Sequence, residues 1–203
     1  MSILLPLFPL DLVLFPGSPL PLHIFEPRYR EMISECLEQN KPFGVVRAKE
    51  DGIAEIGCTA EILSVVKKYA DGRMDILTQG RERFEIARVN QARAFLQAEV
   101  IYLPDEAGKA TSSDEARAVM LHAETLALAG AEPSHSAEIQ EQPLSFHLAG
   151  SLPLDLEFKQ TLLETRSEAE RVRAVISFLE AVLSNLRRTV HVRKKASGNG
   201  HAN

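Results

Sequence analysis

The chain has 203 residues, 45% of them hydrophobic and 25% charged, a balance that indicates a globular protein with a buried core. Its formal net charge of −5 argues against a general polyanion-binding surface, so nucleic acid is not the expected partner. No uninterrupted apolar run approaches the roughly 18 residues of a membrane-spanning helix, and the start of the chain does not resemble a signal peptide. Cys36 and Cys58 are expected to be buried thiols in a reducing cytoplasm, where we therefore place the protein.

The opening segment, residues 4–30, contains six prolines among strongly apolar strand formers. Each proline removes a backbone donor and fixes φ near −65°, so the segment can form neither a helix nor a central strand. It predicts short, edge-like strands separated by bends.

A short amphipathic helix follows, because Pro27 suits the first helical position and apolar residues recur at helical spacing from Tyr29 to Leu37. Asn40 and Pro42 end it. Beyond it the sequence predicts strands at residues 43–47, 58–69, 74–79, 83–89 and 95–103, with a hairpin turn at Asp71-Gly72. The first half is therefore predicted to be one helix among strands that form a closed or partly closed barrel.

Composition changes at residues 104–113, which have no apolar period and contain several helix and strand breakers. Capping-box patterns at Ser112 and Ser167 and an N-cap at Asp155 predict helices beyond it, at residues 116–128, 144–152, 156–164 and from about 167 onward. The fold class is α+β: a β domain over residues 1–108, a small helical bundle over 109–192, and a disordered tail over 193–203.

The motifs of the chain resemble the Lon protease amino-terminal domain family. The resemblance rests on Leu-Phe-Pro-Leu at residues 7–10, Leu-Phe-Pro-Gly at 14–17 and Pro-Leu-His-Ile-Phe-Glu-Pro-Arg-Tyr at 21–29. A second block, Ser-Phe-His-Leu-Ala at 145–149 and Leu-Pro-Leu at 152–154, is similar to stand-alone bacterial members without ATPase or protease modules. The resemblance implies a PUA-like β pseudobarrel followed by helices, and a role in substrate recognition.

Catalytic and metal-binding motifs are missing from the sequence. It has no G-x-x-x-x-G-K-[ST] loop to hold phosphates, and it ends before the position where a Lon-type Ser-Lys module would begin. His122-Ala123-Glu124 matches half of a zinc-deaminase motif, but the P-C-x-x-C half is absent. We therefore expect no enzymatic activity, no metal and no cofactor.

Four residues of the best-matched block are weak candidates for peptide contacts: His23, Phe25, Arg28 and Tyr29. A structural interpretation is favoured for this block, because Glu26 can accept at the helix N-terminus, Arg28 can pair with a carboxylate, and Tyr29 lies on the apolar face of the helix. The basic stretch at residues 187–195 is read as a solvated helix end.

The leading functional hypothesis is a non-enzymatic module that binds extended peptides or a partner protein. Bent, proline-interrupted strands leave grooves and unpaired edges to which an extended peptide could add main-chain hydrogen bonds. A PUA-like RNA-binding protein and a cryptic hydrolase are the alternatives. A basic concave patch would favour the first, and a deep pocket with paired titratable groups the second.

Overall fold

The computed structural model describes residues 4–129 and 142–198 of the chain, and it contains a β-barrel followed by helices. The strands are β1 Leu5–Leu10, β2 Pro19–Ile24, β3 Phe43–Lys49, β4 Gly52–Ile53, β5 Ile56–Lys68, β6 Met74–Asn90 and β7 Gln97–Tyr102. The helices are α1 Pro27–Gln39, α2 Ser112–Ala129, α3 Leu144–Gly150, α4 Leu156–Glu164 and α5 Glu168–Gly198. The α+β prediction is confirmed.

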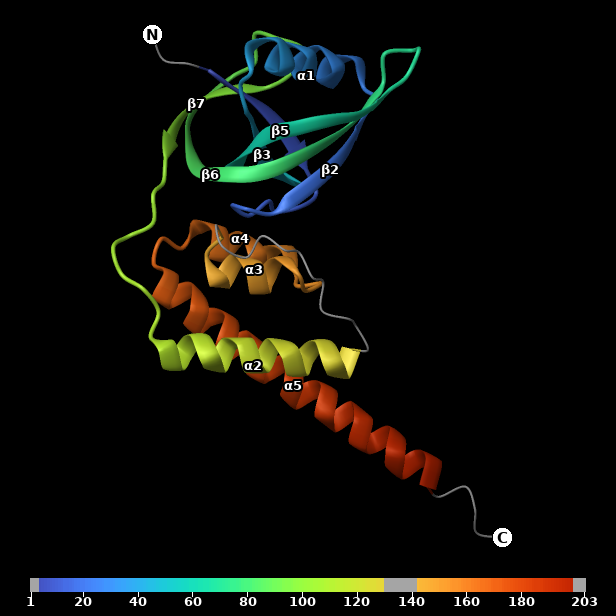
Figure 1. Cartoon of the computed structure of the whole chain (residues 1–203), viewed down its shortest axis with the longest axis vertical. Coiled ribbons are helices and arrows are strands. Elements are labelled where there is room, and N and C mark those ends of the chain that lie inside the picture. Colours follow the sequence, from blue (N-terminus) through green and yellow to red (C-terminus); the bar gives the residue numbers. More distant parts are fainter. Residues whose placement is uncertain (1–3, 130–141, 199–203) are drawn as a thin grey trace.

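Five strands close the barrel in the order β1-β7-β6-β5-β3, because β1 also pairs with β3 in parallel. The crossover between these two parallel strands contains β2 and α1, and α1 lies across one end of the barrel (Figure 1). Its predicted limits are confirmed: Pro27 begins the helix, and Asn40, in the left-handed region at φ 50°, ends it. The predicted cap at Glu26 is wrong, since that side chain makes no capping hydrogen bond.

The prediction that the opening segment contains only edge-like strands is wrong for β1, which has neighbours on both sides. Leu5 and Pro6 pair with β7, whereas residues 7–10, which include Pro9, pair with β3. Leu7 also donates its N–H to the Leu96 carbonyl beside β7 at 2.8 Å, but Pro6 pairs with β7 alone and Pro9 with β3 alone. Neither proline therefore breaks a second ladder.

The strand β6 is continuous over 17 residues, whereas two separate strands were predicted within it. Its pairing with β5 contains three register shifts, and bulges of this kind increase the twist and bend of a strand. One long strand can therefore curve around the barrel through residues 80–82, which were left between two predicted strands.

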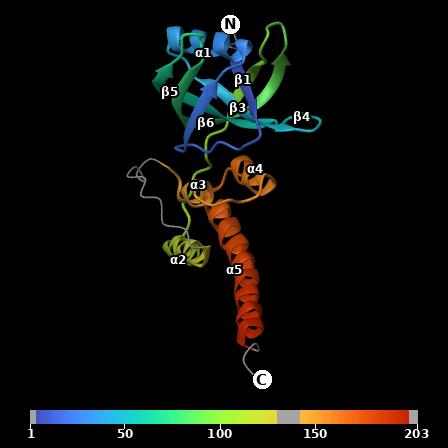
Figure 2. The ribbon, with the colours of Figure 1, turned by 90° about the vertical axis from the view of Figure 1, so that its right-hand side faces the viewer.

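The helices extend from the barrel, with α3 and α4 next to it and α2 crossing the long α5 farther away (Figures 1 and 2). Asp155 caps α4 as predicted, accepting from the Phe158 backbone N–H at 2.8 Å. The capping box predicted at Ser112 is wrong, because the Thr111 hydroxyl caps α2 by accepting from Asp114 at 3.1 Å.

The chain from residue 193 was predicted to be a disordered tail, but α5 continues as a helix to Gly198. Residues 199–203 lie outside the described part of the chain. One buried apolar cluster continues from the barrel into the helices, and it includes Phe15 from the first and Phe146 from the second. Both cysteines are buried free thiols, which confirms the prediction for them.

Candidate functional site

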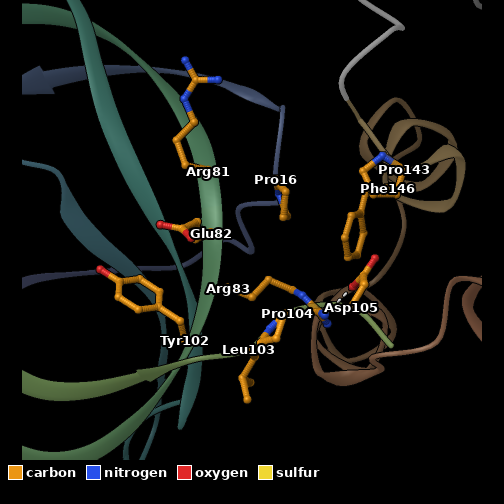
Figure 3. A pocket seen from close by; sticks show the side chains of 10 residues that line it. All are labelled: Pro16, Arg81, Glu82, Arg83, Tyr102, Leu103, Pro104, Asp105, Pro143 and Phe146. Carbon is orange, nitrogen blue, oxygen red and sulfur yellow. Dashed lines mark hydrogen bonds and ion pairs between the residues drawn. The ribbon is translucent and has the colours of Figure 1, made fainter. Parts of the chain in front are cut away.

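A hollow of about 360 Å³ lies where the barrel meets α3, and we call it the junction hollow (Figure 3). The barrel side chains face Pro143 and Phe146 of the helical part across it. Its lining comprises Pro16, Arg81, Glu82, Arg83, Tyr102, Leu103, Pro104, Asp105, Pro143 and Phe146. Three of these are prolines, whose fixed φ makes the rim stiff before any ligand arrives.

The loop between β1 and β2 forms part of this junction because it approaches β6 very closely. A Cβ atom at position 80 would lie 2.2 Å from the Phe15 carbonyl oxygen, so only glycine fits there. The Gly17 N–H donates to the Gly80 carbonyl at 2.8 Å and holds the loop in place. The Phe15 ring then stacks on Phe146 of α3 with 4.9 Å between centroids, which joins barrel and helices.

A buried ion network borders the hollow and contributes Arg83 and Asp105 to its lining. Asp105, in the segment between β7 and α2, accepts from Arg83 of β6 and from Arg171 of α5, the latter at 2.6 Å. Arg171 also donates to Glu168 at 2.7 Å, and its side chain is fully buried. Its guanidinium lies 4.3 Å from the Phe146 ring centroid, a cation–π geometry.

The charges cancel within this network. Burial lowers the pKa of Arg83, and the neighbouring Asp105 carboxylate opposes that shift by favouring the charged guanidinium. Arg81, two residues before Arg83 on β6, pairs with Glu61 at 2.5 Å. Both arginines that line the junction hollow are thus already neutralised. The other contact groups are the Glu82 carboxylate and the proline, leucine and aromatic surfaces.

Two neighbouring hollows share lining residues with the first. One of about 200 Å³ shares Arg81 and Glu82 with it, and one of about 340 Å³ between β1 and the end of α1 shares Tyr102. Tyr102 therefore lines both the junction hollow and the 340 Å³ hollow, and the residue is 49% exposed. The three hollows therefore adjoin one another through shared lining residues.

The four predicted site residues lie outside these hollows and differ in burial and in their contacts. Tyr29 is 6% exposed and packs on Phe8 with 4.1 Å between centroids, so it is a core residue. Arg28 donates to Glu26 at 2.9 Å. His23 and Phe25 are exposed and stack on each other, with 6.0 Å between centroids. None of the four lines the three hollows described above.

His23 belongs to a small surface cluster with two residues that the sequence did not connect to it. Its Nδ1 lies 2.5 Å from the Asp75 carboxylate, which also accepts from the Tyr69 hydroxyl at 2.8 Å. These two hydrogen bonds hold the pKa of Asp75 below its ordinary value, the one from His23 contributing most. The cluster links the end of β2 to the β5–β6 hairpin.

The edge of β2 is poorly suited to main-chain pairing with a peptide. β2 pairs with β6 in antiparallel register, and Pro19 and Pro21 cannot donate, so the hydrogen-bonded pairs fall at Leu20, Leu22 and Ile24. The outward backbone groups are then those of the two prolines and His23. Only one outward N–H remains in that stretch, as in edges that resist strand addition.

No group of three or more His, Cys, Asp or Glu side chains that could hold a metal ion occurs among the residues that the structure describes. His122 and Ser151 do form a pair, with 2.7 Å between Nε2 and Oγ. The serine hydroxyl donates to the Leu148 carbonyl at 3.0 Å, so it must accept from the histidine. That polarity is the reverse of what a general base needs to activate a serine.

Within the described ranges, no helix has the length and apolar character needed to cross a membrane.

Comparison with known proteins gives the family. The model of the ATP-dependent protease La (LON) substrate-binding domain matches residues 4–181. This chain belongs to that family. A Lon protease of Paraburkholderia phytofirmans is 27% identical over 202 residues, which cover 92% of this chain and 25% of that protein. Lon protease 2 of Myxococcus xanthus is 27% identical and matches 86% of this chain and 23% of its own length. The chain thus spans about a quarter of these relatives.

Solved structures support the fold. A Lon N-terminal domain protein from Xanthomonas campestris has a TM-score of 0.69 at 24% identity, covering 86% of this chain and 98% of that one. The N-terminal domain of a Mycobacterium avium complex Lon protease has a TM-score of 0.64 at 23% identity, covering 88% and 98%. The family predicted from the opening motifs is confirmed.

Proposed function

We propose that this chain is a non-enzymatic module of the cytoplasm that binds extended segments of unfolded proteins, and that the junction hollow holds an apolar side chain of the bound segment. The observation that carries the proposal is the lining of the hollow. Proline, leucine and aromatic surfaces converge there, while both lining arginines are neutralised by ion pairs. Apolar pockets with a few fixed polar groups are typical of ligand sites.

The size of the hollow agrees with this role. About 360 Å³ lies near the lower limit of small-molecule pockets, a volume suited to one large side chain rather than to a cofactor. The two adjoining hollows then receive the residues on either side of that anchor. Buried aromatic anchors contribute most of the free energy in such interfaces, so Tyr102, exposed yet part of two walls, is the contact residue we select.

RNA binding, the first alternative, finds less support. A phosphate backbone requires a surface with unpaired cations. Arg81 and Arg83 are both committed to carboxylates on this side of the barrel, and Arg93 at the third hollow pairs with Glu31 and Glu35 at 2.6 and 2.5 Å.

A cryptic hydrolase, the second alternative, also lacks a suitable constellation. Of the described residues, His122 and Ser151 come nearest to one, and their hydrogen bond has the wrong polarity. The purified protein is expected neither to hydrolyse ATP nor to cleave casein. Turnover that co-elutes with the protein from a sizing column would overturn the non-enzyme part of the proposal.

The binding proposal is tested by fluorescence anisotropy with a labelled, unfolded peptide that carries one phenylalanine, and with a labelled RNA, each at low and moderate salt. Tyr102→Ala is expected to weaken peptide binding about tenfold, which corresponds to about 1.4 kcal/mol. Ile101→Ala is the matched control, because Ile101 is 58% exposed and points to the opposite face of β7. It should leave binding unchanged.

Peptide affinity should vary little with salt, since burial of apolar surface drives it. Tighter RNA binding that falls steeply as salt rises, or equal effects of the two variants, would contradict the proposal.

A further inference from the structure

A bulge in β6 turns two successive side chains toward the hollows. In the pairing of β5 with β6, a register shift leaves Thr59 opposite two residues, Arg81 and Glu82. Side chains alternate between the two faces of a regular strand, yet both of these residues are exposed. Bulges re-aim side chains in this way next to functional sites. Arg81 and Glu82 line both the junction hollow and the hollow of about 200 Å³, which we call the second hollow.

The position of Glu82 is fixed by its backbone. The Thr59 hydroxyl accepts from the Glu82 N–H at 2.9 Å and donates to the Glu82 carbonyl at 3.3 Å. Thr59 is buried, so water does not compete for these two hydrogen bonds. The Glu82 carboxylate therefore extends from a defined point in the wall of the junction hollow, between Arg81 and Arg83 on the strand (Figure 3).

Ion pairs neutralise most of the charged side chains in the three hollows and leave two charges over. The pairs are Arg81 with Glu61, Arg83 with Asp105, and Arg93 with Glu35. In the part of the chain that the structure describes, the Glu82 carboxylate has no hydrogen bond and no ion pair. Over the same residues, the Lys41 ammonium forms no ion pair and donates to the neutral Gln39 side chain at 3.0 Å. One anion and one cation can thus meet the charges of a ligand.

These two charges lie in different walls of the second hollow. Glu82 belongs to the wall that this hollow shares with the junction hollow, and Lys41 to the wall that it shares with the third hollow, of about 340 Å³. A segment with its apolar anchor in the junction hollow therefore passes Glu82 before Lys41 where it enters the second hollow. Side chains on one face of an extended segment recur at every second residue, about 7 Å apart. A basic residue two positions from the anchor, and an acidic residue two positions farther, would match these charges.

We propose that Glu82 and Lys41 select extended segments by the order of their charges: an apolar anchor, then a basic residue, then an acidic residue. The inference rests on the proposed function, because the order is counted from an anchor in the junction hollow. The exchanged order places like charges next to each other, and such repulsion is a common source of specificity. Both side chains are exposed, so each ion pair contributes modestly. The two orders should differ about fivefold in affinity.

Two labelled peptides of identical composition, with both ends capped, test the charge order. One has a phenylalanine, a lysine two positions away and a glutamate two positions beyond it, with small uncharged residues elsewhere, and the other has the lysine and glutamate exchanged. Each is made in both chain directions, because side chains alone do not fix the direction of the bound main chain. In fluorescence anisotropy at low salt, the first order should bind about fivefold more tightly in the direction that binds better. The ratio should shrink as salt screens the exposed pairs.

Variants of the full chain assign the effect to the two side chains. Glu82→Gln should reduce the fivefold ratio to about twofold, and Lys41→Gln should do the same. Glu85→Gln and Lys68→Gln are the matched controls and should keep the ratio, because both side chains are exposed and neither lines any of the three hollows. Equal affinities for the two orders, tighter binding of the exchanged order, or equal effects of variants and controls would overturn the inference and leave peptide binding itself in place. If an uncharged peptide with the same phenylalanine also fails to bind, both the inference and the proposed function are wrong.

Discussion

Arg171→Met should destabilise the protein strongly, because Arg171 is the buried centre of the network that joins α5 to the barrel. The wild-type guanidinium makes six hydrogen bonds, to Ser145, Glu168, Asp105 and the Thr165 carbonyl, at 2.6 to 3.0 Å. Methionine keeps most of the apolar stem but leaves the carboxylates of Asp105 and Glu168 without this cation. Breaking one partner of a buried ion pair typically costs about 3–5 kcal/mol.

The magnitude is expected at the lower end of that range, about 3 kcal/mol, because the Asp105 side chain is 35% exposed and keeps its contact with Arg83. For a chain of this size, that corresponds to a fall in melting temperature of about 6–12 °C. Urea unfolding followed by circular dichroism measures the difference, provided that the m-value does not change.

Arg117→Met is the matched control for this experiment. Arg117 donates to Glu180 at 2.8 Å, but both side chains are about half exposed, so the pair contributes below about 1 kcal/mol. A cost for Arg171→Met no larger than that for Arg117→Met would contradict the role assigned to the network. Complete loss of the helical signal in the far-ultraviolet spectrum of Arg171→Met would also contradict that role. The network is proposed to join the helices to the barrel, and the helices should form without it.

Three further predictions concern stability and cleavage. Tyr29→Ala should lower the free energy of unfolding by about 3–5 kcal/mol, because it removes a buried ring packed on Phe8, and an unchanged melting temperature would refute this. Burial, aided by the nearby His147, holds the pKa of His122 below its ordinary value near 6.5. The resulting stability is present above pH 6.5 and is lost as the pH falls below it, so His122→Gln should flatten urea midpoints measured between pH 7.5 and 5. Trypsin should cut first at the exposed Lys109, between the two proposed domains, and early cleavage within the opening segment would contradict the barrel assignment.

Local signals in the sequence predicted the parts of the fold that depend on a few neighbouring residues. Pro27 and Asn40 predicted the limits of α1, and Asp155 predicted the start of α4, because caps and fixed φ angles act within one turn. The same reasoning failed at residues 80–82, which were left between two predicted strands. Gly80 is instead the place where the β1–β2 loop approaches a continuous β6.

The junction could not be predicted because its members come from distant parts of the chain. Arg83 and Asp105 are 22 residues apart, and Arg171 follows Asp105 by 66 residues, with no spacing that relates the three. One signal was present in the sequence. Arg171 directly precedes Val172, which belongs to the apolar pattern of the helix, and an arginine buried beside such a residue requires a partner for its charge. The junction hollow is a product of this long-range assembly, which explains why the residues proposed from the opening motif lie outside it.

Locating a bound segment on the protein tests whether the junction hollow binds peptide. A peptide carrying a photoreactive benzoyl-phenylalanine in place of its single phenylalanine would be cross-linked to the full chain, and the attachment sites would be mapped by mass spectrometry. Attachment is expected around the junction hollow, at Tyr102, Leu103, Pro104 or Phe146, with competition by the unmodified peptide. Attachment confined to His23 and Phe25 at the exposed end of β2, or labelling that excess unmodified peptide does not reduce, would contradict peptide binding in the hollow.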